Sequence, residues 1–226
     1  QGRIIHCEGE ARKVTRTELD GTVTTLVDRF ESGRFNRPND VICHSDGSLY
    51  FTDPSMRRSF AEREIPGPEG EDGVWAGAQV YRVAPDDSIS TVVTVEYPNG
   101  LAFSPDEKTL YIANTRSNQY VHAIEIDAEG NYIRRRIFCD FSGDDVGFPD
   151  GMKVDSSGRV FCTGPGGIWV VETDGKHIGT IRFPEQAINM AFGGEDLCTL
   201  FVTAHTSVYS VRVRTPGQPH PFYLQK

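Results

Sequence analysis

The feature that most constrains this chain is a segment that recurs four times with the same internal order. Each copy opens with Asn or Asp, usually after Pro, continues as an alternating apolar run, and reaches a polar turn and a second apolar run. The four copies are RPNDVICHSDGSLYFTD (37–53), YPNGLAFSPDEKTLYIAN (97–114), FPDGMKVDSSGRVFCTG (148–164) and AINMAFGGEDLCTLFVTA (187–204). Repetition at this period indicates an array of similar supersecondary units.

Two further strand signals follow each repeat, and turns such as Asp-Gly and Gly-Gly separate them in the way typical of hairpins. The third strands are predicted at 79–83, 120–126, 167–173 and 207–213, and the fourth at 89–95, 132–140, 177–183 and 222–226. No convincing amphipathic helix is apparent. Units of about 40–60 residues with four antiparallel strands each predict an all-β fold, a β-propeller.

The start of the chain carries only three strand signals before the first full unit, at 3–8, 12–19 and 22–30. They match the second, third and fourth strands of a blade. The chain therefore predicts a single β-propeller domain over 1–226, with about four full blades plus a partial one. Three alternatives stay open for closure of the ring: a missing N-terminal segment, strands supplied by a second chain, or an unusually small ring.

Composition excludes several classes of protein. The 226 residues carry a formal net charge of −9 and no long apolar run, so neither a nucleic-acid partner nor a membrane is expected. The short basic run 134–136 is predicted to be a solvated strand end. Five cysteines at wide spacing, without a C-x-x-C pair, argue against a disulfide framework and a thiolate zinc site. Free thiols in a reducing compartment, hence a cytoplasmic location, are expected.

The recurring Asn or Asp stands where the innermost strand of each blade would line a central channel. Asn39, Asn99 and Asp150, with Asn189 as a fourth candidate, would then meet near one end of the channel. Amide and carboxylate oxygens suit a hard divalent cation such as Ca²⁺, Mg²⁺ or Mn²⁺, and suit Zn²⁺ less well. The alternative is that these residues only shape turns before the strands.

The motifs RPNDV…GSLYFTDP, YPNGLAFSPDEKTLYIANT and FPDGMKVDSSGRVF closely resemble the gluconolactonase family, which includes regucalcin, and the resemblance covers essentially the whole chain. It implies a six-bladed propeller with one divalent cation in the channel, Ca²⁺ first and Zn²⁺, Mg²⁺ or Mn²⁺ as alternatives. It also implies hydrolysis of a small-molecule sugar lactone; more distant relatives hydrolyse organophosphates.

The resemblance also implies roles for individual residues. Asn39, Asn99 and Asp150 match metal-site positions, and Asp150 matches the general base. Arg37 and Asn39 match substrate-binding positions, and the insertion 54–77 falls where the family has a loop over the channel mouth. From its own place in the sequence, Asp53 is expected at a strand end near the channel mouth, where it orients a loop or a group behind the site residues, or has a structural role.

One departure from the family pattern bears on activity. The family supplies a glutamate ligand from an N-terminal EGP motif that is absent here, and the EGE at 8–10 is expected in a strand-to-strand turn that cannot replace it. Three functions stay open: a metal-dependent sugar lactonase, another ester or organophosphate hydrolase on the same scaffold, or a non-catalytic propeller that binds a partner or Ca²⁺. No serine or cysteine nucleophile motif is present, so the histidines are expected to be structural.

Overall fold

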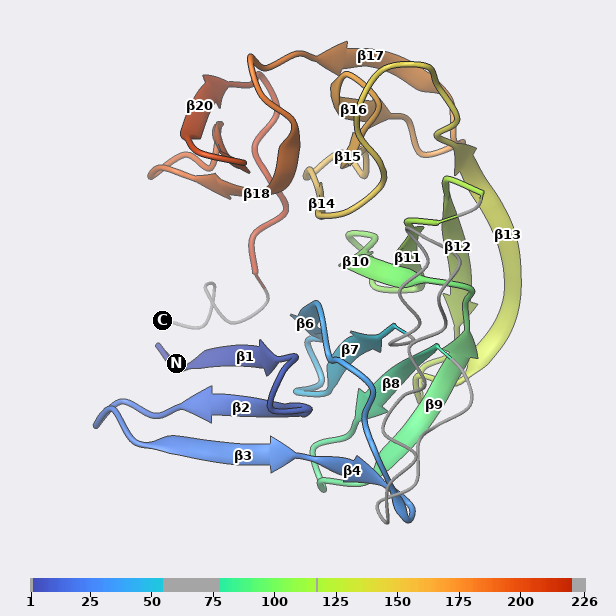
Figure 1. Ribbon diagram of the computed structural model, residues 1–226, viewed down its shortest axis with the longest axis vertical. Helices are drawn as coiled ribbons and strands as arrows, with labels where there is room; N and C mark the ends of the chain where they lie inside the picture. Colours follow the sequence, from blue (N-terminus) through green and yellow to red (C-terminus); the bar gives the residue numbers. More distant parts are fainter. Residues whose placement is uncertain (1, 55–77, 117, 221–226) are drawn as a thin grey trace. The chain divides into compact units, whose positions relative to one another are not determined.

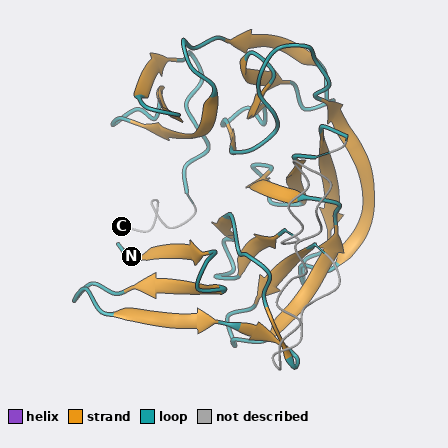
Figure 2. Ribbon diagram, in the orientation of Figure 1, coloured by secondary structure: helices purple, strands orange, loops and turns teal. Residues whose placement is uncertain are grey.

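The computed structural model describes residues 2–54, 78–116 and 118–220 (Figure 1). Within these ranges the chain consists of strands, turns and loops (Figure 2), which confirms the all-β prediction. No helix in these ranges is long and apolar enough to cross a membrane. The chain divides into two compact units, Gln1–Pro98 and Asn99–Lys226, which are described separately.

The first unit contains a three-stranded sheet, a short hairpin and a four-stranded sheet, all antiparallel. The strands are β1 (Ile4–Glu8), β2 (Lys13–Thr17) and β3 (Val23–Val27), then the hairpin β4 (Arg29–Phe30) and β5 (Gly33–Arg34), then β6 (Val41–Cys43), β7 (Leu49–Asp53), β8 (Gln79–Val83) and β9 (Ile89–Thr94). Each sheet is a meander in which consecutive strands pair, as expected for propeller blades.

An aromatic cluster joins the two sheets of this unit. Phe35, which follows the hairpin, packs edge-on against Phe51 of β7 and Tyr81 of β8, with ring centroids 5.0 and 5.1 Å apart. Val14 of β2 completes this fully buried group. Buried aromatic pairs of this kind contribute about 0.5–1.5 kcal/mol each beyond the area they remove from water.

The second unit contains two four-stranded sheets and one three-stranded sheet, again antiparallel meanders. The strands are β10 (Pro98–Phe103), β11 (Thr109–Asn114), β12 (Tyr120–Ile126) and β13 (Tyr132–Asp140), then β14 (Met152–Val154), β15 (Val160–Gly164), β16 (Gly167–Val171) and β17 (His177–Ile181), then β18 (Ala187–Gly193), β19 (Thr199–Ala204) and β20 (Val208–Arg212). In Figure 1, β13 is the long outer strand of its sheet.

Two apolar cores fill the space between successive sheets of this unit. One includes Met152 and Cys162 from the middle sheet and Val121 from the sheet before it. The other includes Phe161 and Leu200 from the middle and last sheets. Because a sheet stacked on both faces has no solvated side, all five residues of β15 are buried, and its sequence VFCTG lacks the polar alternation of a surface strand.

The strand predictions are largely confirmed. The predicted strands 79–83, 120–126 and 132–140 coincide with β8, β12 and β13, and 134–136 is exposed as expected. The β4–β5 hairpin was not predicted, since two-residue strands carry almost no periodic signal. The predicted strand 222–226 and the loop residues 55–77 lie outside the described residues.

Candidate functional site

Three of the four recurring Asn and Asp residues, Asn99, Asp150 and Asn189, belong to successive sheets of the second unit. The space around the glycines that follow Asn99 and Asp150 shows how closely neighbouring sheets approach there. A methyl group added at Gly100, next to Asn99, would lie 2.0 Å from the backbone oxygen of Asp150. A methyl group added at Gly151, next to Asp150, would lie 2.2 Å from Oδ1 of Asn189. The inner edges of the three sheets therefore approach at this register, as the repeats predict.

Glycine is required at these two positions because the next sheet approaches the backbone closely, not because the backbone adopts a left-handed conformation. Neither Gly100 nor Gly151 is among the glycines with positive φ. Gly100 lies within β10, and the Gly151 N–H donates to the carbonyl of Ile188 at 3.1 Å. A side chain at either position would enter the backbone or the Asn side chain of the next sheet. At these two positions the glycines therefore allow the next sheet to approach, and both interpretations of Asn99 and Asp150, as ligands or as turn residues, stay predictions.

The side-chain amide of Asn99 has a hydrogen-bond partner at its nitrogen but none at its oxygen among the described residues. Its side chain is 6% exposed, and Nδ2 donates to Thr115 Oγ1 at 2.9 Å. Its carbonyl oxygen Oδ1 is buried and has no hydrogen-bond partner among the described residues. A buried acceptor left unpaired costs about 1–3 kcal/mol. Such an oxygen suits a bound cation or a donated substrate hydroxyl, so the residue fits the metal that the sequence predicts.

Asp150 is held through its backbone. Its N–H donates to Oγ1 of the buried Thr163 at 2.9 Å, and the same hydroxyl donates to the Phe148 carbonyl at 3.0 Å. The side chain is half-buried. Burial and the negative charge of Asp150 raise the pKa of the neighbouring Cys162 thiol well above its usual value. Cys162 therefore stays protonated and is a core residue, not a nucleophile.

Asn189 differs from Asn99 in how its amide oxygen is used. Its Oδ1 accepts the N–H of Met190 at 2.7 Å, and the Thr203 hydroxyl donates to its backbone carbonyl at 3.3 Å. The oxygen that would face a ligand is thus already bound by the local backbone.

Arg37 and Asn39 belong to the first unit and are both exposed. The Asn39 N–H donates to the Thr52 carbonyl at 2.9 Å. Arg37 lies over the β1–β2 turn: its Nη2 is 2.5 Å from Oε1 of Glu10, and a methyl group at Gly9 would lie 2.9 Å from its Cγ. The EGE segment was expected in a strand-to-strand turn that cannot replace a missing glutamate ligand, and Gly9 and Glu10 do lie in the turn after β1. The structure shows that its second glutamate pairs with the predicted substrate-binding arginine.

Asp53 fixes the segment that carries Arg37 and Asn39. Its fully buried carboxylate accepts the N–H of Asn36 at 2.8 Å and the N–H of Arg37 at 2.6 Å. Burial raises the pKa of Asp53 to about 6, although these hydrogen bonds and the charge of Arg12 act in the opposite direction. The expectation that Asp53 orients a loop is confirmed. Sequence alone identified the residue but not its partners.

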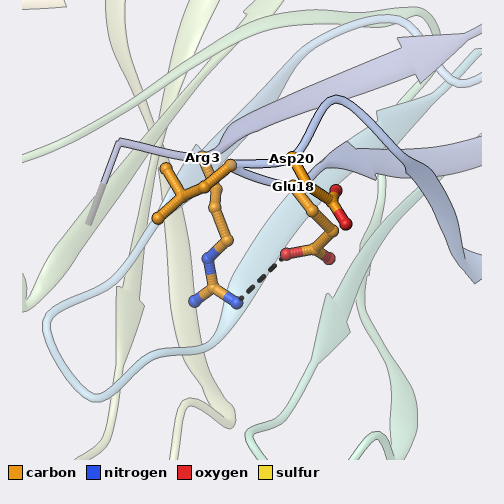
Figure 3. Close-up of a pocket in the computed structure, with 4 residues that line it drawn as sticks. Arg3, Glu18 and Asp20 are labelled. Carbon is orange, nitrogen blue, oxygen red and sulfur yellow. Dashed lines mark ion pairs between the residues drawn. The ribbon is translucent and has the colours of Figure 1, made fainter.

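Other features of the described residues do not form a competing site. A surface hollow of about 500 Å³ is lined by Arg3, Glu18, Leu19 and Asp20 (Figure 3), with Arg3 and Glu18 3.6 Å apart, and none of the predicted site residues lines it. In the described part of the chain no three His, Cys, Asp or Glu side chains gather as metal ligands would.

The structure thus brings Asn99, Asp150 and Asn189 to one register within the second unit. Convergence of the full set, with Arg37 and Asn39, stays a prediction. So do the roles assigned to these residues.

Comparison with known proteins places the chain in a family. Residues 1–206 match the profile described as the SMP-30/Gluconolactonase/LRE-like region. The chain is 32% identical to the gluconolactonase of Zymomonas mobilis over 225 residues, covering 96% of this chain and 62% of that protein. It is 36% identical to pentonolactonase XacC of Haloferax volcanii over 194 residues, covering 81% of this chain and 60% of that protein.

A solved gluconolactonase structure from Xanthomonas campestris superposes with a TM-score of 0.78 at 33% identity, covering 95% of this chain and 68% of that chain. The β-propeller prediction is confirmed by this likeness and by the blade-like sheets. The chain spans 62% and 60% of the length of the two curated relatives named above. It belongs to the SMP-30/gluconolactonase/LRE-like family.

Proposed function

We propose that this chain hydrolyses a sugar lactone, with Asp150 as general base beside a divalent cation. The observation that carries the proposal is the register of Asn99, Asp150 and Asn189 in successive sheets, together with the buried Asn99 carbonyl that has no partner among the described residues. Relatives named gluconolactonase and pentonolactonase support the substrate class.

The cation would be held by Asn39, Asn99 and Asp150, with Ca²⁺ expected first and Mg²⁺, Mn²⁺ or Zn²⁺ as alternatives. When bound, it supplies a positive charge that polarises the lactone carbonyl and stabilises the oxyanion. The two asparagines are neutral, so they hold the ion without cancelling its charge.

Asp150 would remove a proton from the water that attacks the carbonyl carbon. Collapse of the tetrahedral intermediate breaks the ring C–O bond, and the proton passes from Asp150 to the leaving alkoxide oxygen, giving the open hydroxy acid. The Asp150 N–H donates to the Thr163 hydroxyl, which itself donates to the Phe148 carbonyl, so the backbone that carries the carboxylate is held in place.

Arg37 and Asn39 would bind the sugar. A guanidinium offers several N–H donors to hydroxyl and carbonyl oxygens. Asp53 accepts the Arg37 N–H and so fixes the backbone of this residue, and the exposed Glu10 pairs with its guanidinium at the surface.

Replacing the proposed base tests the reaction. The variant Asp150→Asn keeps the shape of the side chain but cannot accept the proton. We expect its kcat for glucono-1,5-lactone, followed by the pH drop of acid release, to fall by about a hundredfold or more. Full activity in this variant would end the proposed role of Asp150.

Chelation tests the cation. Treatment with a chelator should abolish turnover, and added Ca²⁺ or Mn²⁺ should restore it. Hydrolysis that is insensitive to chelation would contradict a metal-dependent mechanism. A panel of lactones and phosphotriesters separates a lactonase from another hydrolase on this scaffold, and cation binding without any turnover would identify a non-catalytic protein.

A further inference from the structure

Thr115 connects two of the candidate ligand residues. It directly follows β11, in the first sheet of the second unit, and is 9% exposed. Its Oγ1 accepts a hydrogen bond from Asn99 Nδ2 at 2.9 Å and donates one to the Pro149 carbonyl at 2.7 Å. Pro149 immediately precedes Asp150, so one hydroxyl links the Asn99 amide to the Pro149–Asp150 peptide of the next sheet.

The direction of these bonds decides which way the Asn99 amide faces. A carbonyl oxygen can only accept, so the single hydroxyl proton of Thr115 is committed to Pro149. Towards Asn99 the hydroxyl can therefore only accept, which requires the NH₂ end of the amide to face Thr115. The carbonyl end must then point the other way, and this is the buried oxygen without a partner among the described residues.

Comparison with the next sheet shows that this arrangement is particular to Thr115. In the repeat alignment Thr163 of β15 corresponds to Ala113 of β11, which has no hydroxyl. Thr163 acts within its own sheet, between Asp150 and Phe148. Thr115 lies two residues further along and bonds across to the following sheet instead.

We propose that Thr115 is a positioning residue: its hydroxyl turns the Asn99 carbonyl toward the cation and ties that amide to the Asp150 segment, so that both ligand residues are held as one unit. The inference rests on the proposed function, because it concerns the same cation.

The test compares Thr115→Val, which keeps the shape and removes the hydroxyl, with Thr115→Ser, which keeps the hydroxyl. Partners that orient a metal ligand typically contribute roughly 10–100-fold in affinity. We expect Thr115→Val to weaken Ca²⁺ binding, measured by calorimetric titration of the chelator-treated protein, by about tenfold or more. Thr115→Ser should stay within about threefold of the parent.

A matched control removes another buried threonine hydroxyl. Thr15 is fully buried and donates to Glu8 at 2.6 Å in the first unit, so Thr15→Val should leave Ca²⁺ affinity unchanged. Equal affinity in Thr115→Val and the parent would overturn the role of Thr115 alone. A parent that binds neither Ca²⁺ nor Mn²⁺ would overturn the proposed function, and the inference with it.

A measurement on the parent covers the case in which Thr115→Val does not fold. The Asn99 side-chain signals in a ¹⁵N,¹³C spectrum can be assigned by their loss in Asn99→Ala. We expect the NH₂ proton that is donated to Thr115 to exchange slowly without cation, and the amide carbonyl carbon to shift when Ca²⁺ is added. Fast exchange of that proton, or a carbonyl that does not respond to Ca²⁺, would contradict the proposal.

Discussion

At the scale of single residues, small side chains decide how close the candidate ligands can come. Gly100 and Gly151 have the backbone of ordinary residues but no room for a side chain, since the next sheet fills the space. A scale of β-propensity does not predict this role, because it counts glycine in a strand only as destabilising. The contact with Asp150 and Asn189 explains why glycine stands next to these candidate ligand positions.

Gly100→Ala should therefore destabilise the protein by roughly 1–3 kcal/mol, the usual effect of overpacking, because its methyl group would meet the Asp150 carbonyl. The measurement is the urea unfolding midpoint. Gly179→Ala in β17 is the matched control, since nothing lies within 4 Å of the added methyl there. It should change stability by less than about 0.5 kcal/mol in the unfavourable direction. Equal effects would refute the close-approach interpretation.

A second residue-scale prediction concerns pH. His122 on β12 is 6% exposed, and its Nδ1 is buried without a hydrogen-bond partner among the described residues. Burial, together with the charge of Arg135, lowers the pKa of His122 to about 4. The unfolded chain takes up this proton near pH 6.5, so between about pH 6.5 and 4 it binds more protons than the folded protein. The His122 contribution to stability is thus present above pH 6.5 and is lost as the pH falls.

Between pH 7 and 5 this effect should cost the parent about 1–2 kcal/mol of unfolding free energy relative to His122→Leu. Denaturant unfolding of both proteins at the two pH values measures it. His205→Leu, which removes an exposed histidine, should follow the profile of the parent. A constant difference between parent and His122→Leu across this range would contradict the prediction.

At the scale of elements, a segment near the end of the described chain joins the last two sheets of the second unit. The segment 215–218 is here called the tail segment. The Ser156 N–H donates to the Pro216 carbonyl of this segment, and the Gln218 N–H of the segment donates to the Val154 carbonyl, both at 2.9 Å. Gly217 donates to Leu197 of the last sheet at 2.9 Å. The tail segment therefore adds backbone hydrogen bonds to both sheets.

Asp155 anchors this junction. It is fully buried, its carboxylate is 2.8 Å from Arg159 Nε, and the Arg159 guanidinium also bonds the Thr215 hydroxyl. Arg159 is 26% exposed, but Asp155 also accepts the N–H groups of Ser157 and Arg159, so Asp155→Ala removes several hydrogen bonds of a buried carboxylate and should lower the unfolding free energy by about 3 kcal/mol.

The control for that variant is an exposed ion pair in the same unit. Asp145 and Arg182 are 3.0 Å apart but more than half exposed, so Asp145→Ala should cost less than about 1 kcal/mol. Both values come from urea unfolding at neutral pH. If the two variants were equally stable, the anchoring role of Asp155 would be wrong.

At the scale of the whole molecule, the prediction of one domain over 1–226 implies that the chain unfolds cooperatively. Contacts divide the chain at Pro98 and Asn99, a boundary that lies inside the continuous strand β10. A blade cannot bury both of its faces alone, and stacked repeats are stabilised by their neighbours. We therefore expect a single calorimetric unfolding transition whose calorimetric and van't Hoff enthalpies agree. Two separate transitions, one for each unit, would show that the units unfold independently.

Strand positions and the register of the candidate ligands follow from the sequence by itself. Apolar alternation, turn residues and the recurring Asn or Asp are local patterns, and each of the four repeats contains them. The tertiary structure alone decided how those ligands are supported: the Thr115 hydroxyl between Asn99 and Pro149, the burial of Asp53 under Asn36 and Arg37, and the pairing of Glu10 with Arg37. Each of these contacts joins residues 16 or more positions apart on different strands or turns. Their meeting depends on how sheets and loops pack together, and no local pattern encodes that.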